Sequence, residues 1–296
     1  MNPYITFVGF GEASYHIAKG LTSEGFPKIY AFDIMSNHPE RGQLIHDRAN
    51  EAQVEIISDM KEAIEKSKYI ISATSAKIAV DIAGSILPLM REGQIFIDIN
   101  AASPMSMKEI DQLDRPEGVK FCDSAVMGVV PTDAHKVPML LSGDGAKEVE
   151  LELSKYGMNL RALNGDAGGS SAVKMFRSIF MKGLTQLMIE SFVSANEFGV
   201  LDEMVSSLSN SIDDKKLVEL ANQLIPRTIV HAERRVSEMK EVVLTLQSLN
   251  QDSLMSEATR DKLSIIAASE YSKAYNGIPP KDYVESIEGL TKIFTK

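Results

Sequence analysis

Cysteine and clustered metal-binding side chains are what this sequence of 296 residues most clearly lacks. Its one cysteine, Cys122, has no partner for an intramolecular disulfide, and the five histidines include no H-x-x-x-H pair. A disulfide-stabilised scaffold is therefore excluded. We also expect no metal site, because a zinc site needs ligands grouped at such spacings.

Long apolar runs and an excess of basic side chains are absent as well. The most apolar stretch, 78–90, is interrupted by Asp81 and Gly84 and is shorter than the roughly 18 residues of a membrane span. Lysine and arginine number 31 against 41 acidic residues, a net charge of −10, which gives no general attraction to nucleic acid or anionic membrane. The N-terminus has no basic lead and no small-residue cleavage site. We therefore expect a cytoplasmic protein that binds neither nucleic acid nor membrane.

The first half of the chain alternates strand-like and helix-like stretches. Short β-rich runs are separated by stretches whose apolar residues share one helical face. The expected strands are 4–8, 28–32, 54–57, 69–73, 94–99 and 119–121, and the expected helices are 13–21, 60–68, 76–90 and 107–113. This alternation predicts βαβ units, and hence an α/β fold with a Rossmann-type, doubly wound parallel sheet.

The second half is predicted to be all-helical. Strand-like runs largely disappear after Asn164, and from Ser170 to about Gly199 apolar residues recur every three or four positions without a proline. At about 1.5 Å per residue such a helix is about 45 Å long, more than a small domain needs. With about 150 residues per domain, we expect one domain over 1–164 and an all-α domain over 165–296.

A glycine-rich turn follows the first expected strand and opens the first helix. It reads Gly9-Phe10-Gly11-Glu12-Ala13-Ser14. In such a G-x-G-x-x-S turn one glycine makes the bend, the second lets backbone approach a pyrophosphate, and the small third residue lets the helix pack on the strand. The helix N-terminus then faces the anion. These six residues are therefore predicted to bind NAD or NADP.

Asp33 bears on the choice between the two cofactors. It ends the second expected strand, where an acidic residue accepts hydrogen bonds from ribose hydroxyls and repels a 2′-phosphate, which favours NAD. Two other interpretations stay open. Asp33 caps a turn or helix, or the nearby Arg41 accommodates the phosphate of NADP.

Several segments resemble, in order, the β-hydroxyacid dehydrogenase family, which includes 3-hydroxyisobutyrate and 6-phosphogluconate dehydrogenases. Besides the glycine-rich turn, the family's D-x-S-T-x-x-P, D-A-P-V-S-G-G and G-x-G-x-x-x-K-x-x-N-N segments correspond to 98–104, 123–129 and 168–178. The similarity covers about residues 1–200, and 231–241 looks like a branch with a C-terminal domain of unknown function. The resemblance implies a dinucleotide-binding Rossmann domain, then an all-helical substrate and dimerisation domain whose long helix packs against its mate in a homodimer.

The resemblance also implies a role for Lys174 as general base in alcohol oxidation and general acid in the reverse reaction. Desolvation and neighbouring positive charge would lower its pKa toward neutrality. Ser178, one helical turn on, is expected to share the substrate hydrogen bond that the family's asparagine makes. Arg177 is expected to bind a substrate carboxylate or to add positive charge.

The remaining candidate residues follow expected strands. Asn100 stands at the carboxyl end of a strand, where doubly wound sheets bind ligands, and is expected to contact substrate and cofactor. A role in turn formation is the alternative for Asn100. The Met127-Gly128-Val129 stretch is expected to form the substrate wall, and the Ala73-Thr74-Ser75 stretch to flank the nicotinamide ribose.

The departures from the family pattern fall on substrate-binding positions. The family's serine and threonine are Asn100 and Ala101 here, and its two asparagines are Arg177 and Ser178. We expect an NAD(P)-dependent oxidoreductase acting on a small β-hydroxy acid, with two alternatives open. An imine reductase has the same architecture but usually another proton donor in place of Lys174. A non-catalytic dinucleotide-binding sensor would explain the altered positions.

Overall fold

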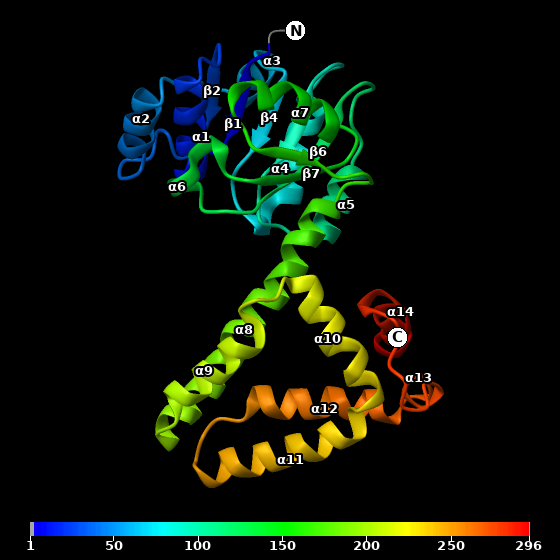
Figure 1. Cartoon of the computed structure of the whole chain (residues 1–296). Helices are drawn as coiled ribbons and strands as arrows, with labels where there is room; N and C mark the ends of the chain where they lie inside the picture. The colour runs from blue at the N-terminus through cyan, green and yellow to red at the C-terminus, as the bar shows by residue number, and fades with distance from the viewer. Residues whose placement is uncertain (1–2, 296) are drawn as a thin grey trace. The chain divides into compact units, whose positions relative to one another are not determined.

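The computed structural model describes residues 3–295 and contains two compact units, the first ending at Ile179 and the second beginning at Phe180. One long helix, α8 (Gly169–Phe198), contributes residues to both units. The domain boundary expected after residue 164 stays a prediction. The two units are described separately below, with their elements labelled in Figure 1.

The first unit is built on an eight-stranded sheet with the order β3-β2-β1-β4-β5-β6-β7-β8. Every strand pairs in parallel with its neighbours except at the antiparallel β6–β7 pair. The strands are β1 (Ile5–Val8), β2 (Ile29–Phe32), β3 (Glu55–Ile56), β4 (Tyr69–Ser72), β5 (Ile95–Asp98), β6 (Lys120–Val126), β7 (Met139–Ser142) and β8 (Leu160–Ala162). The Rossmann-type fold predicted from the sequence is confirmed.

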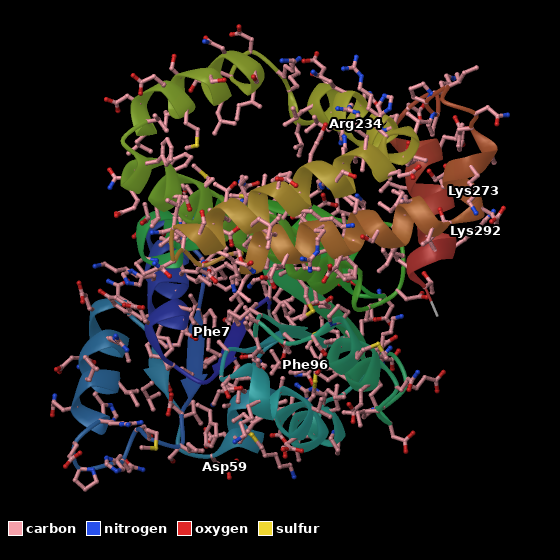
Figure 2. The ribbon with its side chains drawn as sticks, turned by 90° about the horizontal axis from the view of Figure 1, so that it is seen from below. Phe7, Asp59, Phe96, Arg234, Lys273 and Lys292 are labelled. Carbon is pink, nitrogen blue, oxygen red and sulfur yellow. The ribbon has the colours of Figure 1, made fainter. Side chains whose placement is uncertain are left out.

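Helices cover both faces of this sheet because side chains alternate along each strand. Phe7 packs in one apolar cluster with α1, whereas Phe96 packs in the other with α4 and α5; both are labelled in Figure 2. The helices are α1 (Glu12–Ser23), α2 (Gly42–Glu51), α3 (Met60–Glu65), α4 (Ala79–Ile86), α5 (Pro104–Asp111), α6 (Val130–Asp133) and α7 (Ala146–Leu153). Single-turn 3₁₀ helices, η1–η4, cover Ala76–Ile78, Leu87–Leu89, Ala134–Lys136 and Ser154–Tyr156.

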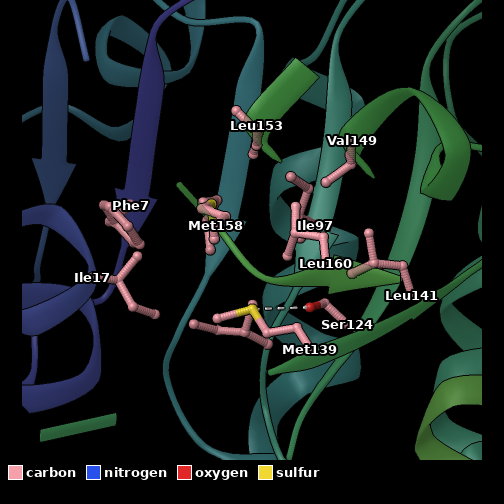
Figure 3. A pocket seen from close by; sticks show the side chains of 12 residues that line it. Phe7, Ile17, Ile97, Ser124, Met139, Leu141, Val149, Leu153, Met158 and Leu160 are labelled. Carbon is pink, nitrogen blue, oxygen red and sulfur yellow. Dashed lines mark hydrogen bonds between the residues drawn. The ribbon is translucent and has the colours of Figure 1, made fainter. Parts of the chain in front are cut away.

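Packing on the face that carries α1 is nearly complete. Phe7, Ile17, Ile97 and neighbouring side chains surround a cavity of about 10 Å³ (Figure 3), which is no more than one water molecule needs. The single polar group drawn there, the Ser124 hydroxyl, donates to the sulfur of Met139 at 3.6 Å. This cavity is a small packing gap rather than a ligand site.

The second unit consists of helices throughout residues 180–295. After α8 come α9 (Leu201–Ile212), α10 (Leu217–Val230), α11 (Ala232–Ser248), α12 (Leu254–Ala268), α13 (Glu270–Ala274) and α14 (Tyr283–Phe294). Helices α11 and α12 lie side by side (Figure 1). Charged side chains such as Arg234, Lys273 and Lys292 are exposed (Figure 2). Within residues 3–295, no helix is both long and apolar enough to cross a membrane.

Glu190 joins α8 to the start of α12. Its buried carboxylate accepts hydrogen bonds from the N–H groups of Met255 (2.7 Å) and Ser256 (2.9 Å) and from the Ser256 hydroxyl (2.6 Å). Ser253, the N-cap residue of α12, makes no side-chain cap. A negative charge from another helix therefore satisfies the unpaired N–H groups of this N-terminus.

Replacing Glu190 by glutamine tests this cap. We expect Glu190→Gln to lower the free energy of unfolding by about 1–3 kcal/mol, because an amide nitrogen then faces N–H groups and cannot accept from them. Glu197→Gln, an exposed change on the same helix, is the control and should have little effect. The measurement is urea unfolding followed by circular dichroism, and equal midpoints for the two variants would contradict the assignment.

Candidate functional site

The turn between β1 and α1 has the geometry that a dinucleotide pyrophosphate requires. Gly9 has φ +89°, and a Cβ there would lie 2.5 Å from the Ala73 carbonyl oxygen, whereas a Cβ on Gly11 would meet nothing within 4 Å. The buried Ser14 hydroxyl donates to the Gly9 carbonyl at 2.7 Å. Gly9 therefore allows close contact with the β4 loop, and Gly11 leaves the approach open.

The N-terminus of α1 leaves backbone donors free. Among residues 3–295, the N–H groups of Glu12, Ala13 and Ser14 have no acceptor, and the N-cap residue Gly11 provides none. By contrast, Asp59 caps α3 and Ser103 caps α5 through their side chains. These free donors and the helix dipole suit a phosphate group.

Asp33 holds this turn from the end of β2. Its carboxylate accepts from the Phe10 N–H at 2.7 Å and from the Met35 N–H at 2.8 Å. The Phe10 side chain lies in the core against Phe7, so Phe10 contributes only backbone here. The turn-capping alternative for Asp33 is thus present in the structure, and it leaves further lone pairs on both oxygens for a ribose.

Asn100 ties together the ends of β4 and β5. Its side-chain oxygen accepts from the Thr74 N–H at 2.8 Å, and its amide nitrogen donates to Ser72 (3.0 Å) and Asp98 (2.8 Å). Asn100 is buried, whereas the Thr74 and Ser75 side chains are exposed. The amide thus shapes the Ala73-Thr74-Ser75 loop, as the turn-forming alternative for Asn100 supposed.

Two buried carboxylates lie side by side, one at the end of β5 and one in the middle of β6. Asp98 and Asp123 are register partners, and both are almost fully buried. Burial raises the pKa of Asp98 to about 6, the hydrogen bonds from Asn100 oppose this rise, and the charge of Asp123 adds to it. Asp98 therefore titrates in the mildly acidic range.

Asp123 binds the start of α8. Its Oδ2 accepts from the N–H groups of Gly168 (3.0 Å) and Ser171 (3.2 Å) and from the Ser142 hydroxyl (3.1 Å), and its Oδ1 accepts from the Ser171 hydroxyl (2.7 Å). The sequence analysis assigned no role to Asp123, although it lies in one segment of the family resemblance and Ser171 in another. Their pairing was not visible from those segments.

Lys174 lies one helical turn after Ser171 and is half-buried. Its amine has no hydrogen-bond or ion-pair partner in the part of the chain that the structure describes. Burial lowers the pKa of Lys174 below the ordinary lysine value, and the negative charge of Asp123 partly opposes this. An unpaired amine of lowered pKa gives up and accepts a proton at lower pH than an ordinary lysine, which suits it to proton transfer.

The next turn of α8 carries the other two candidates. The Ser178 hydroxyl donates to the Lys174 carbonyl at 3.1 Å, so its lone pairs remain available as acceptors. Arg177 is exposed. Within residues 3–295, the guanidinium of Arg177 makes no hydrogen bond to another residue of the site, and Ser178 is linked only to the Lys174 backbone.

The Met127-Gly128-Val129 segment follows β6. Met127 N–H donates to the Pro138 carbonyl at 2.8 Å, and Val129 is 62% exposed. A Cβ on Gly128 would lie 2.9 Å from Val137, so packing alone accounts for this glycine. No hydrogen bond joins this segment to Lys174 within 3–295, and no cluster of potential metal ligands occurs in the same residues.

Two protein families match the chain. The NAD binding domain of 6-phosphogluconate dehydrogenase matches residues 4–157, and a domain of unknown function, DUF1932, matches residues 195–266. Residues 4–157 are therefore an NAD-binding domain. The predicted cofactor class and the predicted family, including its branch with a C-terminal domain of unknown function, are confirmed.

Three relatives share more than a quarter of their residues with this chain. An uncharacterised 28.5 kDa protein of Methanothermus fervidus is 28% identical over 87% of this chain and 96% of its own. The structure of a conserved hypothetical protein from Sinorhizobium meliloti is 30% identical (TM-score 0.64, covering 99% and 97%). Another solved protein of unknown function, described as structurally similar to 3-hydroxyacid dehydrogenases, is 26% identical (TM-score 0.62, covering 89% and 98%).

More distant solved structures share the fold alone. An imine reductase from Myxococcus stipitatus in complex with NADP⁺ is 16% identical (TM-score 0.68, covering 97% of this chain and all of its own). A 3-hydroxyisobutyrate dehydrogenase from Mycobacterium tuberculosis is 15% identical (TM-score 0.60, covering 98% and 99%). The fold therefore accommodates both types of substrate and does not choose between them.

The close approach of Gly9 to Ala73 gives a test of the cofactor turn. We expect Gly9→Ala to weaken NADH binding at least about tenfold, or about 1.4 kcal/mol, because its Cβ would displace the Ala73 backbone. Gly25→Ala is the control, since Gly25 has a similar φ of +81° but open space for a Cβ. An alanine strains the backbone in both variants. Only a loss of affinity confined to Gly9→Ala, measured by NADH fluorescence titration, therefore supports the assignment.

Proposed function

Since the chain belongs to the family of the NAD binding domain of 6-phosphogluconate dehydrogenase, we propose that it transfers a hydride between a nicotinamide dinucleotide and a small β-hydroxy acid. The half-buried, unpaired amine of Lys174 carries this proposal. It lies one turn after Ser171, whose hydroxyl donates to Asp123 on β6, and burial lowers its pKa.

Lys174 acts as the general base in the oxidation direction. The uncharged amine accepts the hydroxyl proton of the substrate while the carbinol hydrogen leaves with its electron pair. Acceptance of that hydride is the chemistry that a nicotinamide would supply when bound. The products are a carbonyl compound, a protonated Lys174 and reduced cofactor, so charge and atoms balance, and the reverse reaction returns the same proton.

The residues around Lys174 bind and orient the substrate. Arg177 pairs with the substrate carboxylate, and the Ser178 hydroxyl accepts a hydrogen bond from the substrate. The Met127-Gly128-Val129 segment forms a largely apolar wall. Asn100 contributes mainly by shaping the 73–75 loop, because its amide already makes three hydrogen bonds.

The turn that begins at Gly9 would hold the cofactor. The free N–H groups of Glu12, Ala13 and Ser14 bind the pyrophosphate, and the Ala73-Thr74-Ser75 loop flanks the nicotinamide ribose. Asp33 accepts from the adenosine ribose and repels a 2′-phosphate, so NAD is preferred over NADP. Initial rates with the two cofactors test this preference.

The active form is a homodimer built on the second unit. Phe180, Leu184 and Leu187 recur on one side of α8 together with Met181 and Met188, and all five are at least 40% exposed. At 3.6 residues per turn, Glu190, which contacts α12, lies about 120° around the helix from the middle of this stripe. A second copy of the chain is proposed to pack on this stripe, since two-fold dimers are the commonest oligomers.

Two other functions would give different results in activity assays. An imine reductase would use Lys174 to protonate a C=N nitrogen, and its fold is shared. A dinucleotide-binding sensor would bind cofactor without turnover. Assays with β-hydroxy acids, their carbonyl counterparts and cyclic imines separate these three functions.

Removing the amine tests the assignment of Lys174. We expect Lys174→Met to lower kcat about 10²–10⁴-fold by loss of proton transfer, with NADH affinity unchanged. Wild-type oxidation should rise with pH until Lys174 is deprotonated, below the ordinary value of 10.5, and reduction should fall over the same range. Lys182→Met, an exposed change on α8, is the control, and an equal loss of activity there would refute the role.

Sedimentation velocity tests the dimer. The wild type should have twice the chain mass of 32.5 kDa, and Leu184→Glu should shift it to monomer, because a charge is costly to bury in an apolar interface. Gln186→Glu, on the opposite side of the helix, should remain dimeric. A monomeric wild type would exclude the proposed assembly.

A further inference from the structure

We propose that Asp123 is the positioning residue of Lys174: its fixed carboxylate holds the first turn of α8 and supplies the negative charge that the amine one turn later senses. The proposal deepens the function assigned above, because it concerns the group that transfers the proton. It rests on hydrogen bonds, burial and strand register.

The Asp123 carboxylate is held from several elements at once. Donors reach it from β7 through the Ser142 hydroxyl and from the start of α8 through Gly168 and Ser171. The Ser170 hydroxyl also donates to the Asp123 carbonyl at 2.9 Å. Two backbone N–H groups on one oxygen suit the ionised form, which only accepts hydrogen bonds.

This buried charge has no cation in direct contact. No ion pair to Asp123 occurs among residues 3–295, and its register partner on β5, Asp98, is another carboxylate. Hydrogen bonds and the helix dipole therefore stabilise the charge. A positive group nearby gains a favourable Coulomb interaction in this poorly solvated region.

Lys174 provides that positive group. It follows Ser171 by three residues, which places both on the same side of α8. The charge of Asp123 raises the pKa of Lys174 while burial lowers it. The other charged groups near this turn are Asp98 on β5, Lys108 on α5, Asp166 in the preceding loop and Arg177 on α8 itself.

The two effects of Asp123 predict opposite results when it is neutralised. If its charge acts on the amine and the helix start stays in place, loss of the charge leaves desolvation unopposed and the pKa of Lys174 falls. If Asp123 only holds the helix, its loss admits water to Lys174 and the pKa rises toward the ordinary value. A fall in the pKa of Lys174 therefore indicates that the charge of Asp123 acts on the amine, whereas a rise indicates a merely structural role.

The experiment is an NMR titration of the full chain after reductive methylation with ¹³C-formaldehyde, with the Lys174 signal assigned from its absence in Lys174→Arg. We expect Asp123→Asn to lower the pKa of Lys174 by about one unit. Ser171→Ala, which keeps the charge and removes one donor, should produce no downward shift. An unchanged or raised value in Asp123→Asn would overturn the proposal. The titration needs no substrate, so it stands apart from failure of the proposed reaction.

If Asp123→Asn does not fold, Asp123→Ser, which also removes the charge and keeps a hydroxyl oxygen that can accept from the start of α8, is titrated in the same way. The pKa of Lys174 should again fall below the wild-type value, and an unchanged or raised value would contradict the proposal.

Discussion

The Asp123 carboxylate is the contact through which the sheet fixes the helix that carries the candidate chemistry. It stands in the middle of β6 and accepts from Gly168 and Ser171 at the start of α8. Without it, the first turn of a 30-residue helix would expose unpaired N–H groups to the interior. The placement of Lys174 follows from this one buried charge.

The cofactor side is held by a second set of contacts that need no ligand to form. Asp33 fixes the Phe10 N–H, Gly9 lies against the Ala73 carbonyl, and Asn100 fixes the Thr74 N–H. Each of these contacts restrains backbone rather than a flexible side chain, so the turn that begins at Gly9 and the 73–75 loop are ordered before a cofactor binds. Binding then costs less ordering of the protein.

Local patterns were enough to predict the six parallel strands, the glycine-rich turn and the long helix, since each is a property of neighbouring residues. Two strands escaped prediction for other reasons than length. β7 runs antiparallel to β6, outside the βαβ alternation, and β8 has no fully buried residue that would mark it as a core strand. Asp123 and Ser171 are 48 residues apart, and Asn100 bonds to a strand that only the sheet order brings near. Such roles depend on tertiary neighbours, and neither composition nor spacing encodes them.

The first turn of α8 is fixed to the sheet, whereas the following turns are free of such bonds. The contacts with β6 and β7 end at Ser171, whereas Arg177 and Ser178 lie two turns further and bear no side-chain bond to the sheet. Changes at these two positions leave the anchor intact. A lineage, or a protein engineer, is therefore free to alter which molecules are accepted while the proton-transfer apparatus keeps its place.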